Sequence, residues 1–416
     1  MRDLYFGTGE LLLPAAGVDP TAWACIACDQ YTSQPEYWRG AAAQVGDRPS
    51  ALNLILPECF LGEAAARVPK IHQTMRDYLA QGVVTPAVRD GFILTERSTG
   101  SGARVGLVGL MDLEGYEYQA GSRSPIRATE GTIVDRIPPR LSVRRGAALE
   151  LSHVLALIDD PMMSVVEPIY DRRDSLQKLY DFPLMLGGGH LVGYAVTDPG
   201  DLTAIFDALR ALKARVGSGL LYAVGDGNHS LATAKAYWEE IKPSLTPEQR
   251  EYHPARFAMV ELENIHDDAL TFEPIHRVLY GYDGDTLLDE LARYVHERDL
   301  SLAGGENTQE IDVVFEGKQV RLSLSGSSQA LAVSALQTFL DDWMPRHPGT
   351  RLDYVHGEES VRALVSGEKA VGFLLPAMDK SSLFPAVEKL GALPRKTFSM
   401  GAAHEKRYYM EARRLG

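Results

Sequence analysis

Cysteines and long apolar runs are scarce in this chain. Its 416 residues include three cysteines, Cys25, Cys28 and Cys59, which are too few for a disulfide framework. Neither a second cysteine pair nor a histidine at zinc-finger spacing accompanies Cys25 and Cys28, so we expect buried thiols there rather than a metal site. No apolar run approaches the ~20 residues of a membrane-spanning helix, and the first residues lack the pattern of a signal peptide. We therefore expect a cytoplasmic protein without a membrane partner.

Positive charge is also in short supply. Lysine and arginine number 42 against 56 aspartates and glutamates, which gives a formal net charge of −14. Such a surface repels the phosphate backbone of nucleic acids, so small molecules are the predicted partners and nucleic acids are not. A few arginines and backbone N–H groups can still hold a phosphate in a pocket, because that interaction is decided locally. Composition leaves the oligomeric state open, a homo-oligomer included.

Several familiar catalytic and nucleotide-binding motifs are missing. The chain has no Walker sequence, and the glycine run at residues 187–189 does not continue into a dinucleotide-binding fingerprint. Ser399 lacks the leading glycine of a hydrolase nucleophile elbow, and no repeat of fixed period occurs. These absences argue against P-loop NTPases, dinucleotide-dependent enzymes, α/β-hydrolases and solenoids.

The patterns that are present predict a mixed α/β protein of the α+β class. The length of the chain and its apolar share of 45% favour two associated domains. Hydrophobic periodicity predicts helices over residues 63–81, 201–216 and 329–344, and strand hairpins over residues 91–110 and 311–324. The pattern changes near residue 270, so we expect one domain over residues 1–270 and a second, C-terminal α/β domain over residues 271–416.

The segment with the strongest functional signal is a turn between a strand and a helix. An apolar strand over residues 220–224 precedes it and a helix restarts near Leu231, which leaves the first N–H groups of that helix open to an anion. Its glycines permit close backbone approach, its acid can act as a base, and its other side chains offer donors. The turn consists of Gly225, Asp226, Gly227, Asn228, His229 and Ser230. The structural alternative is a glycine turn with a capped helix.

This turn carries a resemblance to a known family. Residues 222–235 resemble the central motif of the domain of unknown function 1015 family, commonly written Ala-Asp-Gly-His-His-Arg-Tyr. Three further segments agree in the same order. Residues 126–132, with Arg136 downstream, resemble the family's His-Glu-x-Thr segment and its following arginine, residues 274–278 resemble Pro-Thr-His-Arg, and residues 393–397 resemble Pro-Lys-Ser-Thr. The resemblance therefore spans most of the chain.

The motif is also similar to one in free serine kinases, and that similarity implies both a fold and an activity. It implies a ParB-like core over residues 1–270 and a nucleotide, ADP or ATP, held with Mg²⁺ over the turn. The implied reaction is phosphoryl transfer to a small hydroxylated metabolite such as serine. Asp226 would orient or deprotonate the hydroxyl, while the side chains and amides of residues 225–230 would hold phosphate. Two other roles stay open: a sensor that binds a nucleotide or phosphometabolite without turnover, and a structural interaction protein.

The chain departs from the resembled motif at two positions. Asn228 stands where the motif has its first histidine, and Ser230 stands where it has arginine. Loss of that arginine removes a phosphate clamp worth ~1.5–3 kcal/mol, so kinase activity needs another cation. The candidates are Arg127, Arg136, Arg140, Arg277 and Lys396, and His276 is a further candidate for phosphate binding. The alternative for each cation is a structural ion pair.

Two further carboxylates are predicted to belong to the site. Glu130 lies in a segment over residues 124–139 whose prolines and glycines are typical of a functional loop. Asp29 lies in a polar stretch over residues 27–38, directly after an apolar segment, and such stretches often line ligand pockets in α/β proteins. The alternatives are a solvated loop acid for Glu130 and an Asx turn for Asp29.

Overall fold

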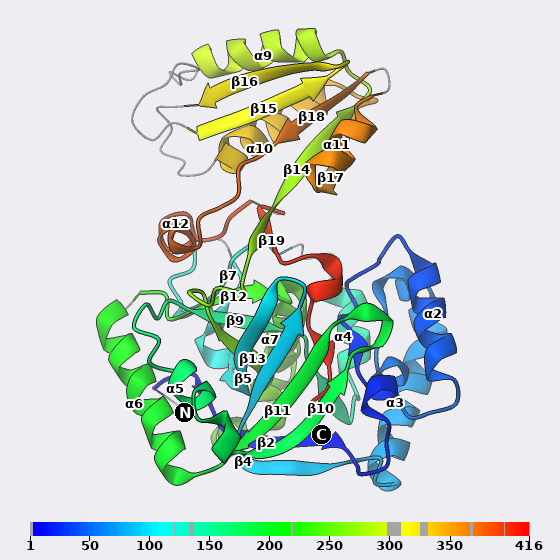
Figure 1. Ribbon diagram of the computed structural model, residues 1–416, viewed down its shortest axis with the longest axis vertical. Coiled ribbons are helices and arrows are strands. Elements are labelled where there is room, and N and C mark those ends of the chain that lie inside the picture. Colours follow the sequence, from blue (N-terminus) through cyan, green and yellow to red (C-terminus); the bar gives the residue numbers. More distant parts are fainter. Residues whose placement is uncertain are drawn as a thin grey trace. The chain divides into compact units, whose positions relative to one another are not determined.

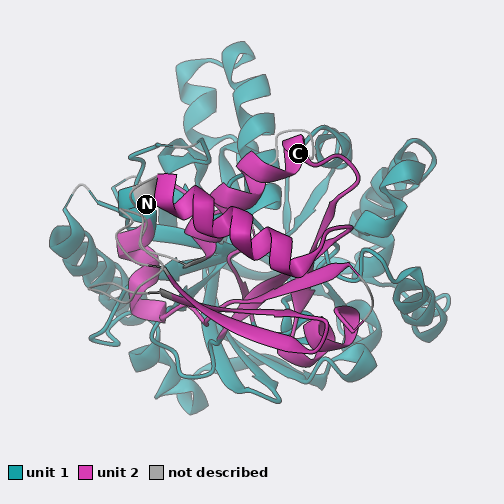
Figure 2. Ribbon diagram, turned by 90° about the horizontal axis from the view of Figure 1, so that it is seen from above, with its two compact units in different colours: residues 1–271, 387–391, 401–416 teal, residues 272–386, 392–400 magenta. Residues whose placement is uncertain are grey.

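The computed structural model describes residues 3–119, 121–132, 137–217, 219–297, 309–324, 332–366, 369–394 and 396–415. The chain divides into two compact units, which Figure 2 shows in different colours. Unit 1 comprises Met1–Thr271, Val387–Gly391 and Gly401–Gly416, and unit 2 comprises Phe272–Ala386 and Ala392–Met400. Both units combine helices with sheets, so the predicted mixed α/β class is confirmed.

A sheet of 13 strands forms the framework of unit 1 (Figure 1). Its order is β6-β7-β12-β9-β13-β5-β4-β2-β21-β8, with β1 on β5 and with β10 joined through β11 to β4. The strands are β1 Phe6–Gly7, β2 Gly9–Pro14, β4 Val84–Thr99, β5 Gly102–Asp112, β6 Tyr116–Glu117, β7 Ile126–Ala128, β8 Leu149–Leu151, β9 Leu155–Ile158, β10 Gln177–Pro183, β11 His190–Val196, β12 Tyr222–Asp226, β13 Phe257–Asn264 and β21 Ala412–Arg414. Two short strands, β3 Cys25–Ile26 and β20 Tyr408–Tyr409, pair apart from this sheet. The predicted hairpin over residues 91–110 is confirmed as β4 and β5.

The helices of unit 1 cover the sheet with apolar faces. They are α1 Pro20–Trp23, α2 Pro35–Val45, α3 Ala64–Ala80, α4 Ile137–Arg144, α5 Glu167–Tyr170, α6 Pro199–Val216, α7 Asn228–Ile241 and α8 Pro247–Tyr252. The predicted helices over residues 63–81 and 201–216 are confirmed as α3 and α6. Asp198 caps α6 by accepting hydrogen bonds from the backbone N–H groups of Gly200 and Asp201, and buried Ile205 and Leu209 lie one turn apart on its inner face.

The end of the chain belongs to unit 1. Tyr408 and Tyr409 of β20 pair with β3, and β21 lies between β2 and β8. The side chains of Tyr408, Tyr409 and Met410 are almost completely buried and belong to the core of unit 1. The sequence-based division grouped residues 401–416 with the second domain, whereas the contacts group Gly401–Gly416 with unit 1.

Unit 2 has its own sheet, in the order β16-β15-β18-β14-β17, with β19 on β14. Its elements are β14 Phe272–Tyr280, α9 Gly284–Glu297, β15 Gln309–Phe315, β16 Lys318–Leu324, α10 Ala332–Trp343, β17 Arg351–His356, α11 Glu358–Leu364, β18 Ala370–Leu374 and β19 Phe398–Met400. Helix α12 Leu383–Leu390 crosses the boundary, since its second half is grouped with unit 1. Its core gathers apolar side chains of α9, β15, α10 and β18. The predicted hairpin and following helix are confirmed as β15, β16 and α10.

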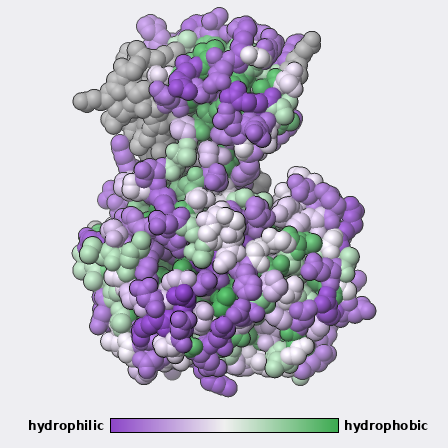
Figure 3. Space-filling view, in the orientation of Figure 1, coloured by the Kyte–Doolittle hydropathy of each residue, from purple (hydrophilic) through white to green (hydrophobic). Residues whose placement is uncertain are grey.

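Hydrophilic residues predominate on the face drawn in Figure 3, and apolar residues are scattered over it. Across the parts of the chain that the structure describes, no helix combines the length and the apolar composition needed to cross a bilayer.

Candidate functional site

The predicted turn joins β12 to α7 and is shaped by Gly227. This residue adopts φ 76° and ψ 23°, in the left-handed region, and as the N-cap of α7 it has no side chain of its own to cap the helix. A Cβ atom on Gly227 would lie 2.9 Å from the backbone Cα of Val154. Glycine is therefore required here both by the backbone conformation and by the close approach of the neighbouring chain.

The variant Gly227→Ala tests this requirement. We expect a loss of at least about 1–2 kcal/mol in the free energy of unfolding, because a Cβ atom disfavours the left-handed conformation and meets Val154. Gly40→Ala is the matched control, since Gly40 lies inside α2 with open space around it and alanine favours helix there. Thermal unfolding should show a lower melting temperature for the first variant only. Equal melting temperatures for the two variants would contradict the argument.

Parallel pairing of β7 with β12 brings a second segment to the turn. The register sets Ala128 beside Val224, so Thr129 and Glu130 follow at the same edge of the sheet as Asp226. The hydroxyl of Thr129 donates to the carbonyl of Val224 (2.6 Å) and lies 3.4 Å from Nδ2 of Asn228. The Oδ1 atom of Asn228 is buried without a hydrogen-bond partner. Glu130, which the sequence predicted for the site, is half-buried at this edge.

Asp226 faces a cation that the sequence did not predict. Its Oδ1 atom accepts a hydrogen bond from the backbone N–H of Gly227 (2.9 Å). Its Oδ2 atom lies 3.3 Å from Nζ of Lys406 and is buried without a hydrogen-bond partner. The side chains of Asp226 and Lys406 are 15% and 8% exposed, so both charges lie largely out of water. A carboxylate oxygen with unused hydrogen-bonding capacity beside a buried ammonium is an unusual arrangement outside functional sites.

A second cation, Arg104, adds to the positive potential near Asp226. Arg104 is buried on β5, and its Nε atom lies 2.8 Å from Oε1 of Glu263 on β13. Burial alone would lower the pKa of Arg104, but the charges of Glu263, Glu261 and Asp226 raise it above its ordinary value. Arg104 therefore stays charged, and its field reaches the carboxylate of the turn.

Glu263 is expected to hold a proton near neutral pH. It is completely buried, and burial followed by the charges of Glu261 and Asp267 raises the pKa of Glu263 to about 8 in spite of Arg104. Between the ordinary pKa of a glutamate and this value, the folded chain holds one proton more than the unfolded chain. Stability should then fall by about 1.4 kcal/mol per pH unit as pH rises through this range.

Glu263→Gln should remove that contribution to the pH dependence. The amide keeps the shape of the protonated acid, so the melting temperature of the variant relative to the wild type should increase from pH 5 to pH 8. Glu316→Gln, in an exposed turn, serves as the control. A constant difference between variant and wild type across this range would show that Glu263 does not take up a proton.

His153 belongs to a cluster of four side chains, and one of the others is Ser230 of α7. The Nε2 atom of His153 lies 3.4 Å from Ser230 Oγ and 3.4 Å from Asp29 Oδ2, and Nδ1 lies 2.7 Å from the hydroxyl of Tyr409. Burial opposes ionisation of Asp29, but the charge and hydrogen bond of His153 hold the pKa of that carboxyl below its ordinary range. Ser230 and Asp29 share one ring nitrogen, whereas a hydrolase triad uses both, so this cluster is not a nucleophilic triad.

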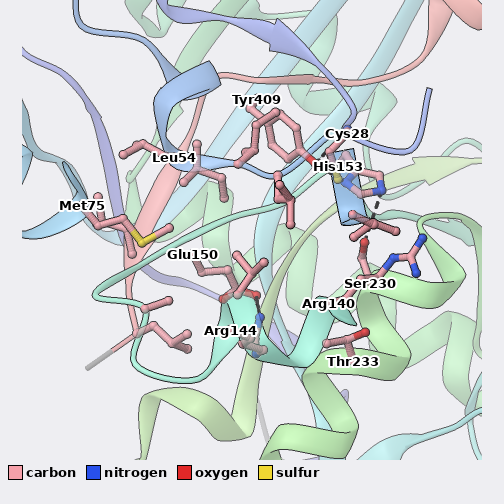
Figure 4. Close-up of a pocket in the computed structure, with 18 residues that line it drawn as sticks. Cys28, Leu54, Met75, Arg140, Arg144, Glu150, His153, Ser230, Thr233 and Tyr409 are labelled. Carbon is pink, nitrogen blue, oxygen red and sulfur yellow. Dashed lines mark hydrogen bonds and ion pairs between the residues drawn. The ribbon is translucent and has the colours of Figure 1, made fainter. Parts of the chain in front are cut away.

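A pocket of about 130 Å³ opens beside this cluster (Figure 4). His153, Ser230 and Cys28 lie at one side of the pocket, and Leu54 and Met75 lie at the other. Its wall is mostly apolar, with Arg140 and Arg144 of α4 and Glu150 of β8 as its charged residues. Burial, and then the charge of Asp29, raise the pKa of Cys28 to about 12, so this thiol is neutral and is a poor nucleophile.

The remaining predicted cations make other contacts or belong to unit 2. In unit 1, Arg127 is buried on β7 and its Nε donates to the carbonyl of Ser124 (2.8 Å), while Arg140 forms an ion pair with Glu58. Arg136 lies outside the described residues. His229 is the second residue of α7 and is half-buried.

His276, Arg277 and Lys396 all lie in unit 2. Nδ1 of buried His276 accepts a hydrogen bond from the backbone N–H of Leu375 (3.1 Å). Arg277 is completely buried, its guanidinium donates to the carbonyl of Lys396 (2.9 Å), and Lys396 is exposed. The role of these three residues in phosphate binding stays a prediction.

Among the described residues, no group of three or more histidine, cysteine, aspartate or glutamate side chains is arranged to hold a metal ion. The turn instead combines backbone N–H groups, two cationic side chains and carboxylates. This combination suits a phosphate group that brings its own metal ion better than a metal ion held by protein ligands alone.

Comparison with known proteins places the chain in a family and gives distant structural likenesses. The family described as "Protein of unknown function (DUF1015)" matches residues 12–343. No curated protein matches the sequence. Solved structures with some likeness include a mutant free serine kinase in complex with AMP (12% identity, TM-score 0.39, 72% of this chain and 92% of that chain). Others are a conserved hypothetical protein from Pyrococcus furiosus (13%, 0.33, 71% and 91%) and C-terminally truncated SbnI from Staphylococcus aureus (10%, 0.35, 68% and 82%).

Proposed function

The chain belongs to the DUF1015 family, which has no assigned activity, and we propose from the geometry of the turn that it is a nucleotide-dependent phosphotransferase. The acceptor would be a small hydroxylated metabolite. The observation that carries the proposal is the buried pair of Asp226 and Lys406 at the start of α7. One carboxylate oxygen there has no hydrogen-bond partner, so it is available to a substrate hydroxyl.

Phosphate would be held by the amides at the start of α7 together with Lys406. The helix start directs N–H groups and a positive partial charge at an anion, and Lys406 adds a full charge in a largely buried position. The positive charge of Arg104 on β5 would add to the positive potential at the turn. These cations would take over the role of the arginine that Ser230 replaces in the resembled motif.

Proton transfer would rest on Asp226. As the acceptor oxygen forms its bond to the terminal phosphorus, the bond from that phosphorus to the nucleotide oxygen breaks, and the hydroxyl proton passes to Asp226 Oδ2. Asp29 and Glu130 are the other carboxylates predicted for the site, and Asp29 acts through His153 and Ser230. Enzymes of this class gain their rate mostly from positioning and from charge stabilisation, which the fixed turn supplies.

The implied cofactor is ADP or ATP with Mg²⁺. Mg²⁺ in such sites keeps several waters and is held by one or two carboxylates together with phosphate oxygens. Asp226 and Glu130 are the carboxylates at this edge of the sheet that would hold it, and the ion would neutralise charge on the transferred phosphoryl group. Serine is the acceptor that the resemblance to free serine kinases implies.

A thermal-shift measurement on the full chain tests the proposal. ADP, ATP and CTP are added with MgCl₂, with and without serine, and the product of each mixture is then assayed for a phosphorylated acceptor. A bound ligand stabilises the fold by about 2.7 kcal/mol at a hundredfold excess over Kd, so a nucleotide should raise the melting temperature. No shift with any nucleotide would refute the proposal. Binding without product would favour the sensor, an alternative that Ser230 supports because it replaces the arginine clamp.

A further inference from the structure

The pocket beside His153 is built for an apolar group. Its far wall is formed by side chains such as Leu54, Met75, Leu149 and Leu415, from segments distant in the sequence. All four belong to the core of unit 1, and Leu54, Leu149 and Leu415 are at most 4% exposed. Nothing in the proposed transfer of a phosphoryl group, which concerns the turn, requires this apolar space.

The size of the pocket indicates the size of its ligand. An apolar cavity of about 150 Å³ in a protein core is large enough for benzene, and this pocket measures about 130 Å³. The single CH₂ group of serine would leave most of that space unfilled. A branched aliphatic or aromatic side chain would fill it and would bury apolar surface on binding.

The charged residues of the wall favour an anionic ligand. Glu150 receives ion pairs from both Arg144 (3.0 Å) and Arg413, and Arg140 pairs with Glu58. The wall itself holds two guanidinium groups, those of Arg140 and Arg144, and one carboxylate, that of Glu150. Arg144 also has two buried nitrogen atoms, Nε and Nη2, without a hydrogen-bond partner. A carboxylate suits this excess of donors.

The polar end of the pocket connects it to the turn. Ser230 and His153 line it, and Ser230 belongs to the first turn of α7, two residues after Asn228. Figure 4 shows Ser230 and His153 linked on one side of the space and Arg144 with Glu150 on another. A ligand in the pocket would therefore have its polar end near the groups proposed for phosphoryl transfer.

We propose that this pocket binds a small hydroxy acid with an aromatic or branched aliphatic side chain. The identification of this ligand as the phosphoryl acceptor, in place of serine, rests on the proposed function. The apolar body occupies the space near Leu54 and Met75, and the wall arginines attract the carboxylate.

Isothermal titration of the full chain with phenyllactate, hydroxyisocaproate and serine tests the inference without any nucleotide. Phenyllactate or hydroxyisocaproate should bind at least about tenfold more tightly than serine, because only they bury an apolar body. Serine binding as tight as both hydroxy acids would overturn the inference.

Two variants locate the ligand in the pocket. Ala147→Leu fills the apolar space from its wall, and Arg144→Met removes a wall charge while Glu150 keeps its partner Arg413. Each should weaken binding of the hydroxy acid at least about tenfold, and Arg145→Met, an exposed neighbour paired with Glu240, should not. Melting temperatures show which variants are folded. Wild-type affinity in a folded Ala147→Leu or Arg144→Met variant would overturn the inference.

An assay of phosphoryl transfer distinguishes failure of the pocket proposal from failure of the proposed function. In one outcome, the wild type binds the hydroxy acid, the two pocket variants do not, and no nucleotide supports phosphoryl transfer. That outcome supports the proposed pocket ligand and refutes the proposed phosphotransferase activity. Phosphorylation of serine, with no binding of either hydroxy acid, supports the phosphotransferase and refutes the pocket ligand.

Discussion

Asp226→Asn should reduce phosphoryl transfer by at least about 100-fold, since general base catalysis by a positioned side chain contributes 10²–10⁴-fold. The amide keeps the oxygen that accepts the Gly227 N–H, so the turn keeps its shape, but it cannot take up the hydroxyl proton. Nucleotide binding should change far less than the rate. The measurement is kcat and KM with the best nucleotide and acceptor from the thermal-shift screen.

The controls for Asp226→Asn must distinguish a loss of catalysis from a loss of folded protein. Removal of the Asp226 charge leaves Lys406 buried without its partner, which is destabilising on its own. The double variant Asp226→Asn, Lys406→Met removes both charges and should recover much of the lost stability without recovering activity. Asp207→Asn, an exposed acid on α6, should behave like the wild type. Activity within about threefold of wild type in Asp226→Asn would exclude Asp226 as the base.

Lys406→Met should weaken nucleotide binding roughly 10- to 100-fold. A charge-assisted hydrogen bond to phosphate contributes about 1.5–3 kcal/mol, and each 1.4 kcal/mol corresponds to a factor of ten. Methionine keeps the apolar stem of lysine, so the packing of the C-terminal segment is retained. Kd for the nucleotide, obtained by isothermal titration, checks this expectation.

Two controls accompany the measurement on Lys406→Met: a second lysine variant and a comparison of Kd at low and high ionic strength. Lys178→Met removes an exposed lysine that pairs with Asp181 on the same strand, and it should leave Kd unchanged. Because Lys406 is largely buried, the difference between Lys406→Met and wild type should persist at high ionic strength. Equal Kd values for wild type and Lys406→Met would exclude Lys406 from the phosphate site.

The local parts of the site were predictable from sequence, because their signals lie within a few residues of one another. A strand, two glycines and a helix in succession identify the β12–α7 turn. Glu130 was predicted from the composition of its loop, whereas the pairing of β7 with β12 that brings it to the same edge joins segments far apart in the sequence and was not predicted. Helices such as α6 were equally clear, because a cap, a proline at the first helical position and a regular apolar face all agree there.

Lys406 and His153 were missed because long-range pairing, and not local pattern, brings them to the turn. Lys406 reaches Asp226 because β20 pairs with β3, and His153 reaches Ser230 because β8 and β9 flank it. One signal was available: Lys406 precedes a run of buried aromatic and apolar residues, and a charge inside such a run is seldom there without a partner. Nothing in that run, however, indicates Asp226 as the partner.

The return of the chain to unit 1 at residues 401–416 also sets the order in which the molecule can be assembled. All of unit 2 lies in sequence between Asp226 and Lys406, so a ribosome will have made the turn and that whole unit before it makes the cation. A nascent chain can form the anion-binding turn early, but it acquires the complete charge pair only when its last segment docks on β3. The closing of a loop this long is entropically costly, and an already folded unit 2 reduces the flexible length that must be closed. Completion of the candidate site therefore depends on a contact that can form only after all of unit 2 has been made.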